Sequence, residues 1–142
     1  MESKIQGFVT LIYFPELKMS VITKDIEIAG DKGRRKIHAL FDSGATYSFI
    51  RKNIAEEMAT LLKYPEPKIF SLENNSKMEA THRTALEIII NGLTISDEIV
   101  VAEKLAEDFI IGASTMQKWR MKLDLDRKEV IIDPKVTELK LI

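Results

Sequence analysis

The stretch Ala39-Leu40-Phe41-Asp42-Ser43-Gly44-Ala45-Thr46 decides how the rest of the chain is interpreted. Three apolar residues lead directly into an acid, and a turn-forming Ser-Gly pair follows it. A carboxylate at the end of a buried strand is costly unless hydrogen bonds or a partner charge stabilise it. We therefore interpret Asp42 as the main functional residue of the protein. The alternative is an acid that only caps the end of a strand through an Asx turn.

Length and composition predict an ordinary globular protein with one core. The chain has 142 residues, of which 45% are hydrophobic and 30% are charged, and its net charge is −1. This length is too short for two domains that each bury an adequate hydrophobic core, so we expect a single domain over residues 1–142. The near-neutral charge leaves no electrostatic footprint for nucleic acid. The basic cluster of Lys32, Arg34, Arg35 and Lys36 surrounds Gly33 and indicates a solvated hairpin turn.

Several classes of protein are excluded or disfavoured by single residue types. The sequence has no cysteine, which excludes disulfides, thiolate catalysis and cysteine-based zinc sites. Its two histidines, His38 and His82, lie far apart and lack the spacing of a metal site, so we expect neither metal nor cofactor. No apolar run approaches the roughly 18–20 residues that a membrane span needs, and the first residues lack the apolar core of a signal peptide. We therefore expect a cytoplasmic protein without a membrane partner.

Most of the chain carries strand signals. Apolar, β-branched and aromatic residues, several of them in alternation with polar ones, predict strands over residues 8–14, 21–28, 36–41, 68–72, 77–85, 86–90, 95–102, 121–125 and 130–132, and an extended tail over residues 136–142. The pair Asn91-Gly92 is a strong hairpin signal. The four polar residues 73–76 predict a second hairpin with an exposed tip. About eight or nine short strands with two short helices indicate a closed or nearly closed β fold.

The two short helices are predicted by residue spacing. In the first, Asn53 and Glu56 have the spacing of a capping box. The apolar residues that follow the cap at helical spacing are Ile54, Met58, Leu61 and Leu62. Pro65 and Pro67 predict the end of the helix. In the second, Ser114 and Gln117 repeat the capping-box spacing ahead of Trp119, which we interpret as a packing residue.

Three landmarks together resemble the retropepsin-like aspartic proteases. Asp42-Ser43-Gly44-Ala45 resembles the active-site loop of that family, and Phe109-Ile110-Ile111-Gly112 resembles its second landmark, an apolar pair and a glycine that open a short helix. The polar hairpin lies between them, where the family keeps its flap. The resemblance spans residues 21–132 and implies an all-β fold: a closed retropepsin-like barrel with two short helices and a flap hairpin, one lobe per chain. Residues 1–19 have no residue-by-residue match.

The resemblance also implies a mechanism. Two carboxylates that share one proton activate a water, because the ionised one acts as base while the protonated one polarises the peptide carbonyl. The chain contains a single Asp-Ser-Gly motif, so the second carboxylate must come from Asp42 of another copy in a twofold homodimer. The expected activity is aspartic endopeptidase cleavage of an extended polypeptide. The terminal segments, residues 5–12 and 136–142, are candidates for the sheet between subunits.

Site residues follow from the same resemblance. Asp42 is the catalytic acid, Ser43 bonds across to its counterpart, and Gly44 supplies an amide to the carboxylate. The residues that the resemblance assigns to substrate binding are Ala45, Thr46, Glu73, Asn74, Asn75, Ser76 and Ile111. The flap tip departs from the family, in which this turn is usually rich in glycine. A catalytically silent module of the same fold, used for dimerisation or peptide binding, is the alternative function.

Overall fold

The computed structural model describes residues 21–71 and 75–138, which form mostly strands. The elements in chain order are β1 (Val21–Gly30), β2 (Gly33–Asp42), β3 (Phe49–Arg51), α2 (Lys52–Met58), β4 (Leu62–Ser71), β5 (Lys77–Ile90), β6 (Leu93–Ala102), β7 (Phe109–Ile111), α3 (Ala113–Lys118), β8 (Lys122–Asp124), β9 (Glu129–Ile131) and the 3-10 helix η1 (Pro134–Thr137). The strand predicted over residues 8–14 lies outside the described residues.

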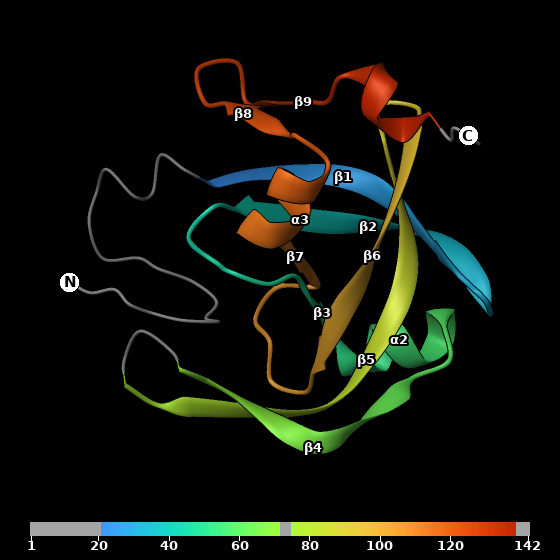
Figure 1. The fold of residues 1–142 in the computed structure, drawn as a ribbon, viewed down its shortest axis with the longest axis vertical. Helices are drawn as coiled ribbons and strands as arrows, with labels where there is room; N and C mark the ends of the chain where they lie inside the picture. Colours follow the sequence, from blue (N-terminus) through green and yellow to red (C-terminus); the bar gives the residue numbers. More distant parts are fainter. Residues whose placement is uncertain (1–20, 72–74, 139–142) are drawn as a thin grey trace.

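Six of the described strands close into a barrel (Figure 1). Their order is β1-β2-β7-β3-β6-β5, and antiparallel pairing of β5 with β1 completes the ring. Strand β4 pairs with β5 outside the ring, while β8 and β9 form a separate two-stranded sheet. The predicted all-β barrel with two short α-helices is therefore confirmed.

The first hairpin forms because its side chains alternate between the core and the outer face. Ile22, Ile26 and Ile28 are buried, whereas the side chains between them are more exposed. Strands β1 and β2 pair over their full length, from Val21 opposite Asp42 to a two-residue turn at the other end. This hairpin delivers the acid to one end of the barrel, as the sequence predicted.

The second sharp turn, Asn91-Gly92, also forms as predicted. Its two residues have φ values of 52° and 78°, and two positive φ angles are typical of the type I′ turn that suits a hairpin. It joins β5 to β6. The strands predicted separately over 77–85 and 86–90 are one continuous strand, β5.

The core consists of two clusters of buried side chains. The larger one fills the barrel and includes the fully buried Phe41 and Phe109. The smaller one lies on the side of β4 and includes Ala45, Phe49 and Phe70. The segment that follows Asp42 therefore rests on a core of its own.

Both helices have a different N-cap residue from the one that the capping patterns predicted. Helix α2 has Arg51 rather than Asn53 as its N-cap, and no side chain makes a capping hydrogen bond. The backbone N of Arg51 donates to the O of Asp108 at 3.1 Å, so strand pairing determines where this helix starts. Helix α3 likewise has Gly112 rather than Ser114 as its N-cap, because β7 runs directly into it.

The prolines that were expected to end the first helix lie in a strand instead. Pro65 and Pro67 belong to β4, where the pairing with β5 shifts register between Lys63 and Lys68. Proline is tolerated at such an irregularity on an outer strand because no ladder hydrogen bond is lost. Leu62, predicted for the buried face of the helix, begins β4 and is 49% exposed.

The extended tail predicted over residues 136–142 is wrong in its described part. Residues Pro134–Thr137 form η1, because the Asp133 side chain accepts a hydrogen bond from Lys135 N at 3.0 Å and proline fits the first position of a helix. Residues 139–142 lie outside the described part of the chain.

Candidate active site

Asp42 ends β2 with its side chain enclosed, since the residue is only 1% exposed. Its Oδ1 accepts a hydrogen bond from Gly44 N at 2.9 Å, and its carbonyl oxygen accepts one from Ala45 N at 3.1 Å. The bond from Gly44 N lowers the cost of burying the carboxylate, whereas the bond from Ala45 N fixes the backbone of the turn. The segment of residues 42–48, called the Asp42 loop below, thus folds back on its own acid and fixes the direction of the carboxylate.

The Asp42 loop is fastened to the first turn of α3. Strand β7 lies between β2 and β3, so the loop that joins those two strands crosses the end of β7. There Ala113 N donates to Ala45 O at 2.7 Å, and Ser114 N donates to Thr46 O at 3.0 Å. Two segments far apart in the sequence therefore hold each other in place.

Gly112 makes this close crossing possible. A Cβ atom at Gly112 would lie 2.2 Å from Tyr47 O and 2.8 Å from Ala45 O, distances that no side chain tolerates. Its φ of −98° is open to any residue, so the position requires glycine for space rather than for conformation. Just before it, Phe41 and Ile111 pair in parallel register, which brings both landmark segments to the same end of the barrel.

A buried polar cluster that no sequence pattern predicts also holds the loop. Ser48 and Thr115 are 2% and 1% exposed, and their hydroxyl oxygens are 2.6 Å apart. Asp97 on β6 accepts a hydrogen bond from Thr115 at 2.7 Å. No motif connects these residues, which come from three separate elements. The available signal was Thr115 beside the buried Met116, on the helix face that packs inward.

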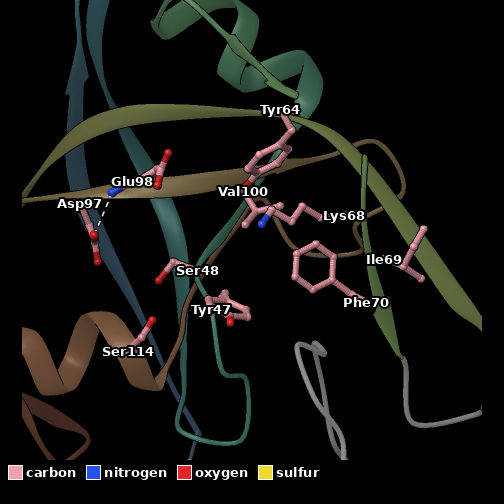
Figure 2. A pocket seen from close by; sticks show the side chains of 10 residues that line it. All are labelled: Tyr47, Ser48, Tyr64, Lys68, Ile69, Phe70, Asp97, Glu98, Val100 and Ser114. Carbon is pink, nitrogen blue, oxygen red and sulfur yellow. Dashed lines mark hydrogen bonds between the residues drawn. The ribbon is translucent and has the colours of Figure 1, made fainter. Parts of the chain in front are cut away.

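A cavity of about 500 Å3 opens beside the Asp42 loop, beneath β4 (Figure 2). Its lining residues come from the loop, β4, β6 and α3, and are Tyr47, Ser48, Tyr64, Lys68, Ile69, Phe70, Asp97, Glu98, Val100 and Ser114. Figure 2 shows the aromatic and apolar side chains of β4 on one side and Asp97, Ser48 and Ser114 on the other. The cavity is therefore amphipathic, with one apolar and one polar wall.

Aromatic contacts connect β4 to the Asp42 loop. The ring of Phe70 meets Tyr47 edge-on at 5.8 Å and Phe49 edge-on at 5.2 Å between centroids. Tyr47 itself remains 47% exposed, and Ile69 on β4 is 58% exposed. Large apolar side chains that face solvent inside a cavity are typical of a binding surface.

Charged side chains surround the ring of Tyr64 at the edge of the same cavity. The Nζ of Lys68 lies 5.3 Å and the Cζ of Arg83 lies 5.1 Å from the ring centroid. Burial, followed by the negative charge of Glu98, raises the pKa of the Tyr64 hydroxyl. The phenol therefore stays protonated at neutral pH and can donate a hydrogen bond.

A second hollow, of about 390 Å3, borders Ser43. Its other lining residues belong to α3 and to the segment that follows it, and are mostly apolar: Ala113, Met116, Gln117, Met121, Leu123 and Leu125. The Asp42 loop thus separates an amphipathic cavity beneath β4 from a mainly apolar hollow along α3 and β8.

The structure places the predicted site residues in two groups. Ser43, Gly44 and Thr46 are exposed on the Asp42 loop. Ala45 and Ile111, predicted to contact substrate, are both fully buried, in the smaller and the larger cluster respectively. Ala45 is thus a buried residue of the Asp42 loop itself, and Ile111 ends β7 in the core of the barrel.

The flap hairpin forms between β4 and β5, with Ser71 opposite Lys77. Asn75 has a φ of 69°, which an asparagine adopts readily, and both Asn75 and Ser76 are exposed at the tip. The predicted flap residues Glu73 and Asn74 lie outside the described residues.

Neither histidine belongs to the site. His38 Nδ1 lies 2.7 Å from Asp25 Oδ1 on the exposed face of the first hairpin, and His82 on β5 bonds the Thr81 hydroxyl at 2.8 Å. Within residues 21–71 and 75–138, no three His, Cys, Asp or Glu side chains come together as metal ligands. None of the helices in that part of the chain is long and apolar enough to cross a membrane.

Comparisons with known proteins agree with this geometry. A family model described as "gag-polyprotein putative aspartyl protease" matches residues 26–118. The retroviral protease-like domain of Ddi1 from Leishmania major is 24% identical, with a TM-score of 0.55, and the match covers 79% of this chain and 85% of that one. EIAV protease, solved in complex with the inhibitor HBY-793, is 20% identical with a TM-score of 0.56, over 72% of this chain and 90% of that one. No curated protein matches the chain significantly.

Proposed function

Because the chain belongs to the gag-polyprotein aspartyl protease family, we propose that it is an aspartic endopeptidase that works as a homodimer. The observation that best supports this activity is the setting of Asp42. Its carboxylate is buried at the end of a strand, accepts a backbone amide, and sits on a loop fastened from two sides. The proposal takes residues 1–142 as one protease domain.

The chemistry needs two Asp42 carboxylates. With one proton shared between them, the ionised carboxylate removes a proton from a water, and the water attacks the peptide carbonyl. The protonated carboxylate donates to the carbonyl oxygen as negative charge develops there. Two like charges so close together cannot both be ionised, so their apparent pKa values separate and belong to the pair. Gly44 N, which already donates to Oδ1, keeps each carboxylate in the orientation that this exchange requires.

One chain supplies one such carboxylate, so the second copy is part of the active site. A twofold axis beside Ser43 brings the two Asp42 loops together. The apolar hollow along α3 and β8 borders Ser43 and gives this interface side chains to bury. The terminal segments 5–12 and 136–142 are further candidates for the interface.

The substrate is an extended polypeptide lying between the Asp42 loop and the flap hairpin. Its main chain adds as a strand along these segments. Thr46, Asn75 and Ser76 are the exposed residues that contact it. The cavity beneath β4 takes one of its side chains, since Tyr47 and Ile69 there are still exposed and gain apolar burial from a ligand.

Substitution of Asp42→Asn tests the activity. The variant keeps the shape of the side chain but cannot ionise, so cleavage of an unfolded protein at mildly acid pH falls by at least about 10³-fold. Asp126→Asn, in the exposed β8–β9 turn, is the matched control and cleaves like wild type. Equal cleavage by Asp42→Asn and wild type rules the protease out. A wild-type dimer that binds but never cleaves unfolded protein would favour the silent binding module.

Mixed dimers test the shared active site. When wild-type protein is mixed with an equal amount of Asp42→Asn and allowed to exchange subunits, half of the wild-type subunits enter mixed dimers. Activity then falls to about half, because a mixed dimer holds one Asp42 carboxylate. Activity that stays constant as the variant is added, while sedimentation shows exchange, contradicts the two-carboxylate mechanism.

A further inference from the structure

A directed chain of hydrogen bonds runs beneath the Asp42 loop. Gly112 N donates to Ser48 Oγ at 3.0 Å, and Thr115 Oγ1 donates to Asp97 Oδ2 at 2.7 Å. Each hydroxyl has one proton. Since the proton of Thr115 points to the carboxylate, the 2.6 Å contact between the hydroxyls must be a donation from Ser48 to Thr115. Every donor and acceptor in the chain is thereby assigned.

The carboxylate at the end of this chain is itself held in place. Asp97 Oδ1 accepts a hydrogen bond from Glu98 N at 2.8 Å and lies 3.6 Å from Lys118 Nζ. Its side chain is only 18% exposed. A charged acceptor makes the stronger kind of hydrogen bond, so Asp97 orients Thr115, and Thr115 in turn orients Ser48.

Ser48 transmits this orientation to the catalytic segment. It is the last residue of the Asp42 loop, and its carbonyl oxygen accepts from Val100 N on β6 at 3.0 Å. Thr115 belongs to the same first turn of α3 whose amides hold the carbonyls of Ala45 and Thr46. A shift of this turn would therefore move the loop at Ala45, Thr46 and Ser48.

We propose that Thr115 and Asp97 are positioning residues for Asp42, which fix the Asp42 loop through the hydroxyl of Ser48. This inference rests on the proposed protease function. Neither residue touches the reacting atoms. Both act by limiting the angles at which the two carboxylates meet, where a misplacement of about 1 Å costs on the order of 10²-fold in rate.

Substitution of Thr115→Val tests the proposal, with Thr84→Val as the matched control. Both residues are buried threonines, and Thr84 donates its hydroxyl hydrogen bond to Thr60 O at 2.9 Å, away from the Asp42 loop. We expect kcat to fall by about 10- to 100-fold for Thr115→Val with KM changed by less than about threefold. Thr84→Val loses comparable stability toward urea and keeps the wild-type kcat. Thr115→Ser, which retains the hydroxyl, restores most of the rate.

Amide hydrogen exchange provides a second measurement that does not depend on cleavage. Thr115→Val should raise exchange at Gly44 and Ala45 by about tenfold, whereas Thr84→Val leaves both amides at the wild-type rate. An unchanged kcat in Thr115→Val, or equal exchange at these amides in the two variants, overturns the proposal. If the wild-type protein cleaves nothing, the proposed function fails, and exchange alone still decides whether Thr115 fixes the loop.

Discussion

The Asp42 loop and the flap hairpin face the same cavity but are built in opposite ways. The loop is joined to β6 and α3 by backbone and side-chain hydrogen bonds, and its Ala45 and Ser48 are buried. Among the described residues, strand β4 of the flap pairs along one edge only (Figure 1). Most of its side chains are exposed. Segments with few buried contacts open more easily than densely bonded ones. The proposed catalytic acid thus lies on a fixed support, whereas the proposed entry for substrate is bordered by a separate strand with fewer buried contacts.

The strongest expected effect comes from disrupting the contact between the Asp42 loop and the start of α3. Gly112→Ala places a Cβ atom against the backbone oxygen of Tyr47, so the loop and α3 must separate. We expect a loss of more than about 3 kcal/mol in unfolding free energy, measured by urea denaturation. Gly33→Ala is the matched control. Its Cβ atom would lie 3.9 Å from the nearest atom, and its stability should stay within about 1 kcal/mol of wild type. Similar stabilities for the two variants would show that the crossing is not tight.

Two neighbouring residues of β4 differ in how well they are packed against the rest of the protein. Phe70 is 7% exposed and contacts Tyr47 and Phe49, whereas Ile69 is 58% exposed. Phe70→Ala should lower the unfolding free energy by about 3 kcal/mol, and Ile69→Ala by less than about 0.5 kcal/mol. If Ile69 contacts substrate, Ile69→Ala should raise KM even though it changes stability little. Equal losses of stability for both would mean that β4 is packed throughout and that the contrast with the Asp42 loop is false.

The smallest expected effect concerns the base of the flap and depends on pH. Asp31, in the first hairpin turn, accepts hydrogen bonds from Thr60 Oγ1 at 2.5 Å and Thr60 N at 2.7 Å, just before β4 begins. The bond from the Thr60 side chain is the main cause that lowers the pKa of Asp31 below its ordinary 3.8.

A lowered pKa means that the ionised form stabilises the fold above about pH 4 and that this contribution disappears as the pH falls through the folded-state value. Between pH 6 and pH 2.5, wild type should therefore lose slightly more stability than Asp31→Asn, measured by urea denaturation at each pH. A parallel decline in both proteins would show that Asp31 does not anchor the flap.

Local patterns in the sequence were sufficient for most of the barrel. Alternation in β1, the Asn91-Gly92 turn and the strand that ends at Asp42 each depend on neighbouring residues, so they can be read from the chain directly. The order of the Asp42 loop, flap and second landmark then identified the fold. These features agree because local preference and the final fold favour the same structure.

The failures occurred where tertiary pairing outweighs local preference. The capping patterns at Asn53 and Ser114 were overridden because β3 and β7 continue into the helices. Pro65 after an amphipathic segment predicts the end of a helix, but an outer strand also accepts proline, and Pro65 lies in β4. The hydroxyl contact between Ser48 and Thr115 joins positions 67 residues apart, and no local pattern reports such a distance.

Strand β5 has a consequence for how the flap moves. Its 14 residues run without interruption from the flap tip into the barrel wall, where they pair with both β1 and β6. The segment contains neither glycine nor proline that would serve as a hinge. Any opening of the flap would therefore have to bend a continuous strand, because the far half of β5 is held in the barrel wall by its pairing with β1 and β6.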